Sequence, residues 1–291
     1  MDITSCTVCP NMCRKDRTRE AGLCHMGADI RICRIARHPW EEPIISGTNG
    51  SGTVFFAGCS LSCVFCQNYE ISHRAVGRIY TEDELIDAMR DLVAQGAHNI
   101  NFVSPTHYAH VLKSVLTKYR PPVPVIYNSG GYDRVETLRE LEGLIDIYMP
   151  DLKYLSPALA ARYSERKDYP DVACRALDEM FRQVGSARVE DGLMKRGMLV
   201  RHLVLPGQSA EGVAVMEYLG RRYGDSIYIS AMSQYVPHGE AEKHPEINRR
   251  LKPIEYKRVV AALARLRISS CFIQDSESSS ERYIPPFLTE E

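Results

Sequence analysis

The feature of this chain that most constrains its fold is a repeated alternation of short apolar runs with amphipathic helical stretches. Helical patterns place apolar residues three or four positions apart, as in Leu85, Met89 and Leu92, in a stretch that Thr81 and Glu84 open with capping-box spacing. Short buried strands separated by such helices predict βαβ units around a parallel sheet. The strand-like runs are 52–56, 99–103, 123–127, 144–149, 198–205 and 226–230, with a weaker one at 270–273.

The number of units predicts the architecture. Six or seven β/α units indicate an α/β fold, a partial (β/α)6 TIM-type barrel over 52–275. A complete barrel has eight units and typically needs about 250 residues, which is more than this stretch contains. A doubly wound sheet is the competing architecture, and in both folds function gathers at the carboxyl ends of the strands. Residues 1–51 lack periodicity and predict a small irregular Cys-rich N-terminal segment, whereas the polar residues 276–291 predict a C-terminal surface tail.

Composition excludes several classes of function. The 291 residues carry 36 Lys and Arg against 37 Asp and Glu, so no basic face is expected and nucleic acid is not a predicted partner. No apolar run approaches the ~18 residues of a membrane span, and the N-terminus lacks the apolar core of a signal peptide. We therefore expect a cytoplasmic protein that does not bind membranes. Ten cysteines in that reducing compartment, eight of them within the first 66 residues, predict metal ligands and not disulfides.

Three of these cysteines form one motif directly after the strand at 52–56. Cys59, Cys63 and Cys66 lie in GCSLSCVFCQNYEIS, whereas a sulfur-bound iron or zinc site normally has four protein ligands. A thioredoxin-type pair would leave Cys59 without a role. A structural zinc site would need a fourth ligand such as His73 or Cys174. A [4Fe–4S] cluster on three thiolates uses all three and leaves one iron open to an exogenous ligand.

The CxxxCxxC spacing at the end of a first barrel strand resembles the signature of the radical S-adenosylmethionine (SAM) enzymes. The resemblance implies that SAM chelates the open iron, that Phe65 lies against its adenine, and that a flavodoxin- or ferredoxin-type donor supplies electrons. It implies reductive cleavage of SAM to methionine and a 5′-deoxyadenosyl radical, which abstracts hydrogen from a substrate. The rival hypothesis is a non-enzymatic iron–sulfur electron-transfer or metal-binding protein.

Further stretches resemble the pyruvate formate-lyase-activating enzyme group. They are TVFFAGCSLSC, MPDLKY, VRHLVLPG and SQYVPHG, and the resemblance implies SAM contacts by Asp151, Lys153, Arg201 and His238.

The chain departs from that group after the second strand. Glycyl-radical activases carry an acidic Gly-Gly-Glu motif there, whereas this chain has SPTHY, so we expect Ser104 and Thr106 to receive the SAM ammonium. The departure weakens the case for a glycyl-radical activase. The substrate stays open among a glycyl-radical enzyme, another polypeptide and a small molecule, and an open barrel mouth favours a protein or peptide.

A second group of cysteines lies near the N-terminus. Cys6, Cys9, Cys13 and Cys24, with Cys33 nearby, have spacings that fit a tetrahedral zinc site or an auxiliary iron–sulfur cluster. Such a closed site would be structural or electron-relaying. Asn128–Gly131 reads equally as a wall of the cofactor site or as a plain turn, and Trp40 carries no assignable chemistry.

Overall fold

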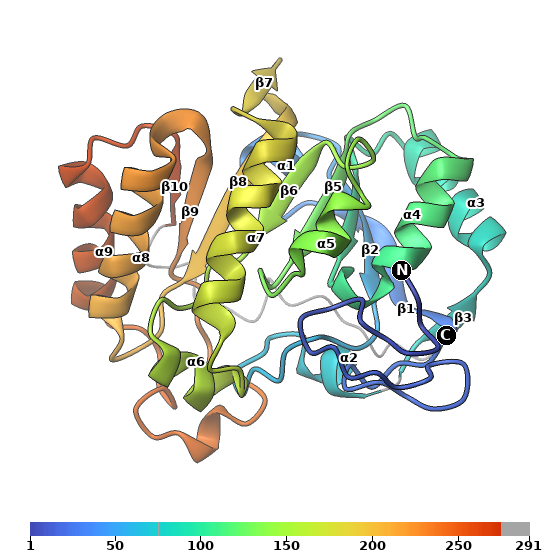
Figure 1. Ribbon diagram of the computed structural model, residues 1–291. Coiled ribbons are helices and arrows are strands. Elements are labelled where there is room, and N and C mark those ends of the chain that lie inside the picture. The colour runs from blue at the N-terminus through green and yellow to red at the C-terminus, as the bar shows by residue number, and fades with distance from the viewer. Residues whose placement is uncertain (75, 275–291) are drawn as a thin grey trace.

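The computed structural model describes residues 1–74 and 76–274, and a single curved sheet organises all of them (Figure 1). Seven neighbouring strands run parallel, which confirms the α/β prediction. In sheet order they are β10 (Cys271–Ile273), β9 (Tyr228–Met232), β8 (Leu193–Leu203), β6 (Ile147–Pro150), β5 (Val125–Ser129), β4 (Ile100–Val103) and β2 (Ser51–Phe56).

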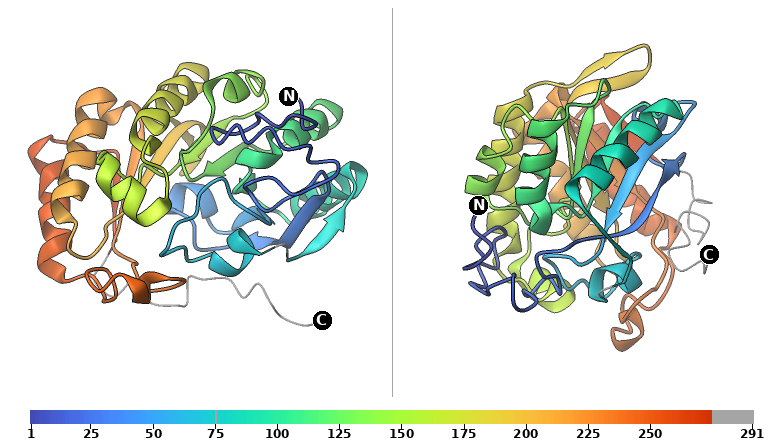
Figure 2. Two further views of the ribbon diagram at one scale, coloured as in Figure 1. Left: turned by 60° about the horizontal axis from the view of Figure 1, so that its bottom comes forward. Right: turned by 90° about the vertical axis from the view of Figure 1, so that its right-hand side faces the viewer.

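Helices cover the outer face of this sheet and complete six β/α units of a partial barrel (Figure 2). The capping box expected of Thr81 and Glu84 begins the first of them. These helices are α3 (Glu82–Ala94), α4 (Ala109–Lys118), α5 (Val135–Arg139), α6 (Pro157–Ser164), α7 (Tyr169–Val184), α8 (Ser209–Arg222) and α9 (Pro253–Arg265).

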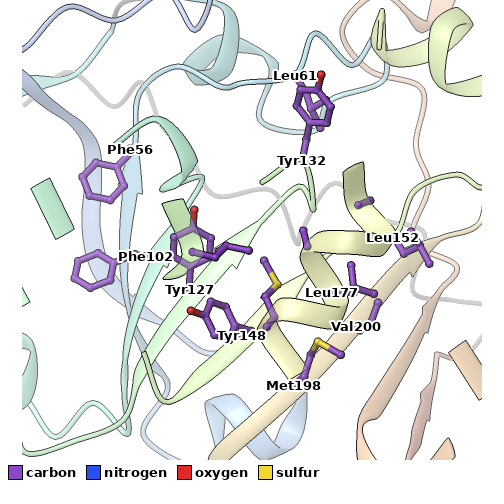
Figure 3. Packing of buried hydrophobic residues seen from close by; sticks show 14 of the residues in the cluster. Phe56, Leu61, Phe102, Tyr127, Tyr132, Tyr148, Leu152, Leu177, Met198 and Val200 are labelled. Atoms are coloured by element: carbon purple, nitrogen blue, oxygen red, sulfur yellow. The ribbon is translucent and has the colours of Figure 1, made fainter. Parts of the chain in front are cut away.

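The main core lies between the sheet and these helices. In Figure 3, Leu177 of α7 lies near Tyr148 of β6 and Met198 and Val200 of β8, and all four belong to one cluster of buried side chains. Because side chains alternate along a strand, Ile147 and Leu199 face the inside of the barrel instead. The alternation therefore separates a helix-packed outer face from an inner face that can hold a site.

The region between residues 30 and 51 is more regular than the sequence predicted. β1 (Ile30–His38) pairs antiparallel with β2 and with β3 (Arg78–Tyr80), so the expectation of an irregular segment is wrong there. A register shift between Ile32 and Arg34 interrupts the alternation of apolar and polar residues, and this hid the strand. Residues 1–29, all described, form no helix or strand and agree with the prediction.

A short plug closes one end of the barrel interior. It is α1 (Pro43–Ser46), whose Ile45 is fully buried against inward-facing side chains of three strands. The Asn99 side chain donates to the Ile45 carbonyl at 2.8 Å. The plug lies at the end of the barrel away from the carboxyl ends of the strands, whereas the cysteine loop and its cavity lie at the other end (Figure 1). The other members of the buried cluster that contains Ile45 are Ile126, Ile147, Met149, Met194 and Leu199.

The remaining described elements are short. They are α2 (Tyr69–His73), β7 (Arg188–Glu190), which pairs with β8, and single 3-10 turns at Thr106–Tyr108, Gly224–Ser226 and Ala241–Lys243. Residue 275 and the expected tail 276–291 lie outside the described residues.

Ile45→Ala should lower the free energy of unfolding by about 2–5 kcal/mol, because it leaves a cavity in the plug that the strands cannot fill. Denaturant titration measures this. Ile254→Ala is the matched control, since Ile254 is 57% exposed on α9 and its loss should change stability by less than about 0.5 kcal/mol. Equal losses in the two variants would show that the plug does not stabilise the barrel.

Candidate active site

The cysteine loop leaves β2 through a glycine. Gly58 has φ +78°, and a side-chain carbon there would lie 2.5 Å from the Cys24 carbonyl oxygen and 2.5 Å from Cγ of Met26. Only glycine fits this turn without a shift of the backbone. The loop then runs without regular structure to α2, which begins at Tyr69, so no helix starts at the Cys63–Cys66 pair as a thioredoxin-type motif requires.

The three thiols of this loop line one cavity of about 210 Å3. The Leu61 amide donates to Cys59 Sγ at 3.4 Å, Ser164 Oγ lies 3.0 Å from Cys63 Sγ, and Ser72 Oγ lies 3.5 Å from Cys66 Sγ. Burial and the neighbouring thiols raise the pKa of Cys59 to about 12 and that of Cys66 to about 11. Three thiols that line one cavity, one of them buried and two half-buried, are suited to a metal centre that takes them as thiolates.

The described cavity lining includes no fourth cysteine, and neither His73 nor Cys174 belongs to it. Within residues 1–74 and 76–274, no three His, Cys, Asp or Glu side chains are arranged to hold a single metal ion. The thiolates that hold a [4Fe–4S] cluster each bind a different iron atom, so they do not surround a single ion. The three thiols are therefore candidates for the ligands of such a cluster.

A charged wall from β6 and β8 faces the same cavity. Asp151 and Arg201 form a parallel bridge, and the Arg201 Nε donates to Asp151 Oδ1 at 3.2 Å while the Lys153 ammonium donates to Oδ2 at 2.7 Å. Burial acts against ionisation, but Lys153 and Arg201 together hold the pKa of Asp151 below its ordinary value. The wall thus stays ionised and can bind a zwitterionic ligand.

The guanidinium of Arg201 makes two more contacts. Its Nη2 donates to the Asn128 amide oxygen at 2.6 Å, and its Nη1 donates to a carboxylate oxygen of Glu41 at 3.1 Å. Glu41 comes from the segment between β1 and the plug, and the sequence interpretation missed it. The available signal was the pair of glutamates before Pro43, at a helix start that was not recognised. Burial raises the pKa of both Glu41 and Glu42, and Arg201 opposes this shift.

Several predicted residues lie where the sequence placed them. Phe65 and Ser104 line the cavity, with the Phe65 ring packed against Tyr163 and Tyr235. Asn128–Gly130 also line it, so this stretch is a cavity wall and not merely a turn.

Thr106 and His238 were expected at the cofactor but do not belong to the cavity lining. The Thr106 hydroxyl donates to the buried carboxylate of Asp133 at 2.8 Å and is thereby turned away from the cavity. His238 is half-buried in the loop after β9, and Gln234 of that loop lines the cavity in its place.

The N-terminal cysteines gather beside the turn at Gly58. Cys6, Cys9 and Cys24 are buried, and a side-chain carbon at Gly22 would lie 3.4 Å from Cys24 Sγ and 3.6 Å from Cys13 Sγ.

Arg17 connects this group with the cysteine loop. Its buried guanidinium lies 4.0 Å from Cys6 Sγ and donates to the His107 carbonyl at 2.7 Å. The His107 ring, in turn, lies 2.8 Å from the Ala57 carbonyl, one residue before Gly58.

Residues 53–219 match the radical SAM superfamily, and they include the three loop cysteines and the charged wall. The chain belongs to the radical SAM superfamily. This family implies a [4Fe–4S] cluster and SAM, and the three converging thiols beside a cavity with a charged wall fit both groups.

Comparison with individual proteins gives distant relatives. The chain is 29% identical over 261 residues to the uncharacterized protein MJ0674 of Methanocaldococcus jannaschii, covering 85% of this chain and 70% of that one. The crystal structure of Streptococcus suis SuiB bound to the precursor peptide SuiA has a TM-score of 0.50 at 12% identity, covering 73% of this chain and 46% of SuiB. SuiB bound to S-adenosylmethionine has a TM-score of 0.51 at 10% identity, with coverage of 76% and 49%. The chain thus spans less than half of SuiB, and the likeness to this radical SAM enzyme concerns the fold.

Among the described helices, none is long and apolar enough to cross a membrane.

Asp151→Asn should destabilise the protein by about 1.5–3 kcal/mol at pH 7, because it leaves the largely buried cations of Lys153 and Arg201 facing an uncharged amide. The pKa of Asp151 in the folded protein is below its ordinary value of 3.8, so its ionisation stabilises the fold above that pH. The difference from wild type should therefore shrink as pH falls below about 4. Denaturant titrations across pH test this, with Asp87→Asn on the exposed face of α3 as control. A difference that grows toward acid pH would contradict the ion-pair assignment.

Proposed function

We propose that this chain is a radical SAM enzyme that cleaves SAM reductively and abstracts hydrogen from a peptide or protein substrate. The observation that carries the proposal is the placement of three thiols and the Asp151–Arg201 wall around one cavity at the carboxyl ends of the strands.

The residues of the cavity have distinct tasks in this proposal. Cys59, Cys63 and Cys66 hold the cluster, which when bound with SAM supplies an electron that breaks a carbon–sulfur bond and yields a 5′-deoxyadenosyl radical. Lys153 and Arg201 orient the carboxylate of the amino-acid head of SAM. The aromatic ring of Phe65 packs against its adenine, and Ser104 accepts from its ammonium.

Two observations support a polypeptide substrate. The sheet of the described residues ends in unpaired edges at β10 and β3, which gives the barrel a lateral opening for a large molecule. SuiB, of similar fold, has been crystallised with a precursor peptide. We place the chain in an activating-enzyme-like branch on the motifs MPDLKY and VRHLVLPG, with a flavodoxin- or ferredoxin-type protein as electron donor.

Cys63→Ala should abolish the cluster and the cleavage of SAM, since two thiolates are too few to hold the cube. The measurement is iron and sulfide content after anaerobic reconstitution, followed by 5′-deoxyadenosine formation with dithionite and SAM. Cys271→Ala, outside the described cavity lining, should retain both. Wild-type protein that assembles the cluster but forms no 5′-deoxyadenosine would favour the electron-transfer protein instead.

We further propose that Cys6, Cys9, Cys13 and Cys24 hold a second thiolate-bound centre, either zinc or an iron–sulfur cluster. Residues 1–29 gather four thiols without the support of a helix, a strand or a disulfide. A buried guanidinium beside Cys6 offsets the negative charge that several thiolates bring. Through Arg17 and His107 this centre would hold the turn at Gly58 in place.

Cys13→Ser should remove the second centre while leaving the first. Cys13 is only half-buried, so the substitution disturbs packing little. Zinc, iron and sulfide are measured in wild type, Cys13→Ser and Cys63→Ala after identical reconstitution. Loss of zinc alone identifies a zinc site, and loss of about half the iron identifies a second cluster. Metal content unchanged by Cys13→Ser would refute a second centre.

A further inference from the structure

A pair of buried hydroxyls contacts Cys63 from outside the cavity lining. Ser164 Oγ lies 3.0 Å from Cys63 Sγ, and the Tyr154 hydroxyl lies 3.1 Å from Ser164 Oγ. Ser164 is fully buried, Tyr154 is 1% exposed, and neither belongs to the described lining of the cavity. The two hydroxyls therefore reach Cys63 through the protein interior and not through the cavity.

The end of α6 holds Ser164 beside the cysteine loop. Ser164 is the last residue of this helix, and the carbonyl oxygen of Tyr163 just before it accepts from the Val64 amide of the loop at 2.9 Å. Serine in a helix often bonds to a carbonyl of its own preceding turn. Among the described residues, the Ser164 hydroxyl has only Cys63 and Tyr154 as partners. The hydroxyl is therefore used toward the cysteine loop and not within the helix.

Tyr154 is held in place by contacts other than Ser164. Its ring packs against that of Tyr169, with 5.6 Å between the ring centroids and 74° between the planes. The Tyr169 hydroxyl accepts from the amide of Lys153 at 2.9 Å and so fixes the backbone next to Tyr154. Within residues 1–74 and 76–274, the Tyr154 hydroxyl has Ser164 as its one hydrogen-bond partner. Any effect of this hydroxyl on Cys63 is therefore exerted through Ser164.

Ligand chemistry decides which hydroxyl donates to which. A cysteine that ligates iron is a thiolate without a hydrogen, so at Cys63 only Ser164 can donate. Ser164 has a single hydroxyl hydrogen, so its oxygen must then accept from Tyr154. The hydrogen bonds thus run in one direction, from Tyr154 to Ser164 to Cys63. Each bond of such a chain polarises the next and strengthens it.

The other two thiols of the loop have longer contacts. The Leu61 amide lies 3.4 Å from Cys59 Sγ, and Ser72 Oγ lies 3.5 Å from Cys66 Sγ. Both of these donors are close in sequence to the thiols that they contact, whereas Ser164 is 101 residues from Cys63. Cys63 therefore has the shortest of the three contacts, from the one donor that the tertiary fold supplies.

A hydrogen bond to a ligating sulfur affects the reduction potential of an iron–sulfur cluster. Reduction adds negative charge, which the cysteine sulfurs share, and a donated hydrogen stabilises that charge. Burial has the opposite effect, because an interior of low dielectric constant disfavours added charge. Removal of a buried donor should therefore favour the oxidised cluster.

We propose that Ser164, supported by Tyr154, is a positioning residue that raises the reduction potential of the cluster by donating a hydrogen bond to Cys63. The cluster is thereby reduced more easily by its electron donor. This inference rests on the proposed function for the presence of the cluster, and it adds two residues that set the potential at which the cluster works.

The test is a redox titration of full-length, anaerobically reconstituted protein without SAM, followed by electron paramagnetic resonance of the reduced cluster. The signal that Cys63→Ala lacks is the signal of the cluster in the cysteine loop. Ser164→Ala should lower the ratio of reduced to oxidised cluster at a fixed potential by about 10-fold, a shift of about −59 mV for a one-electron couple. Tyr154→Phe should lower the ratio by about 3-fold, because Ser164 still donates.

Two further variants separate this role from a loss of packing. The double variant Ser164→Ala/Tyr154→Phe should have the same potential as Ser164→Ala, because Tyr154 acts only through Ser164. Ser51→Ala is the matched control, since Ser51 is also fully buried and its hydroxyl donates to Asn99 Oδ1 at 2.6 Å, at the start of β2. Its potential should equal that of wild type. Tyr154→Phe tests the proposal if Ser164→Ala fails to fold.

An unchanged potential in Ser164→Ala or in Tyr154→Phe would overturn the proposal. A double variant that shifts by the sum of the two single shifts, or an equal shift in Ser51→Ala, would do the same. These outcomes are separate from failure of the proposed function, which is absence of 5′-deoxyadenosine from reduced wild-type protein with SAM.

Discussion

The guanidinium of Arg201 is the interaction on which the interior of this protein depends. It joins Asp151 at the end of β6, Asn128 on β5 and Glu41 from the plug segment, so three elements far apart in sequence meet at one largely buried cation. A buried charge is stable only when its partners are held in place, and the parallel register of β6 and β8 does this. The plug segment and the charged wall of the cavity are therefore held together by the same cation.

Much of the architecture and part of the site could be predicted from local patterns. Apolar runs and helical periodicity located the parallel strands, because each run is buried on both faces. Motif spacing located Cys59, Cys63 and Cys66, because neighbours in one loop remain neighbours in space. Asp151, Lys153 and Arg201 could be placed because they lie at strand ends, which share one edge of the sheet.

What escaped prediction depends on contacts between distant segments. The register shift at Ile32–Arg34 removed the alternation that would have revealed β1, and so concealed how the chain enters the barrel. Without that strand, nothing in the sequence places Trp40 or Glu41 inside the cavity. Thr106 was misplaced for a related reason, since its hydroxyl is bound by Asp133, a partner that sequence spacing does not indicate.

The missing side chain at Gly58 has a consequence for how the molecule assembles. The Cys24 carbonyl occupies the space that a methyl group would need at residue 58. The N-terminal coil therefore packs directly against the turn that begins the cysteine loop. The coil precedes β2 and its loop in the chain, so it has no turn at Gly58 to pack against until those residues have been synthesised. The coil can therefore reach its final conformation only after the later residues that it packs against have been synthesised.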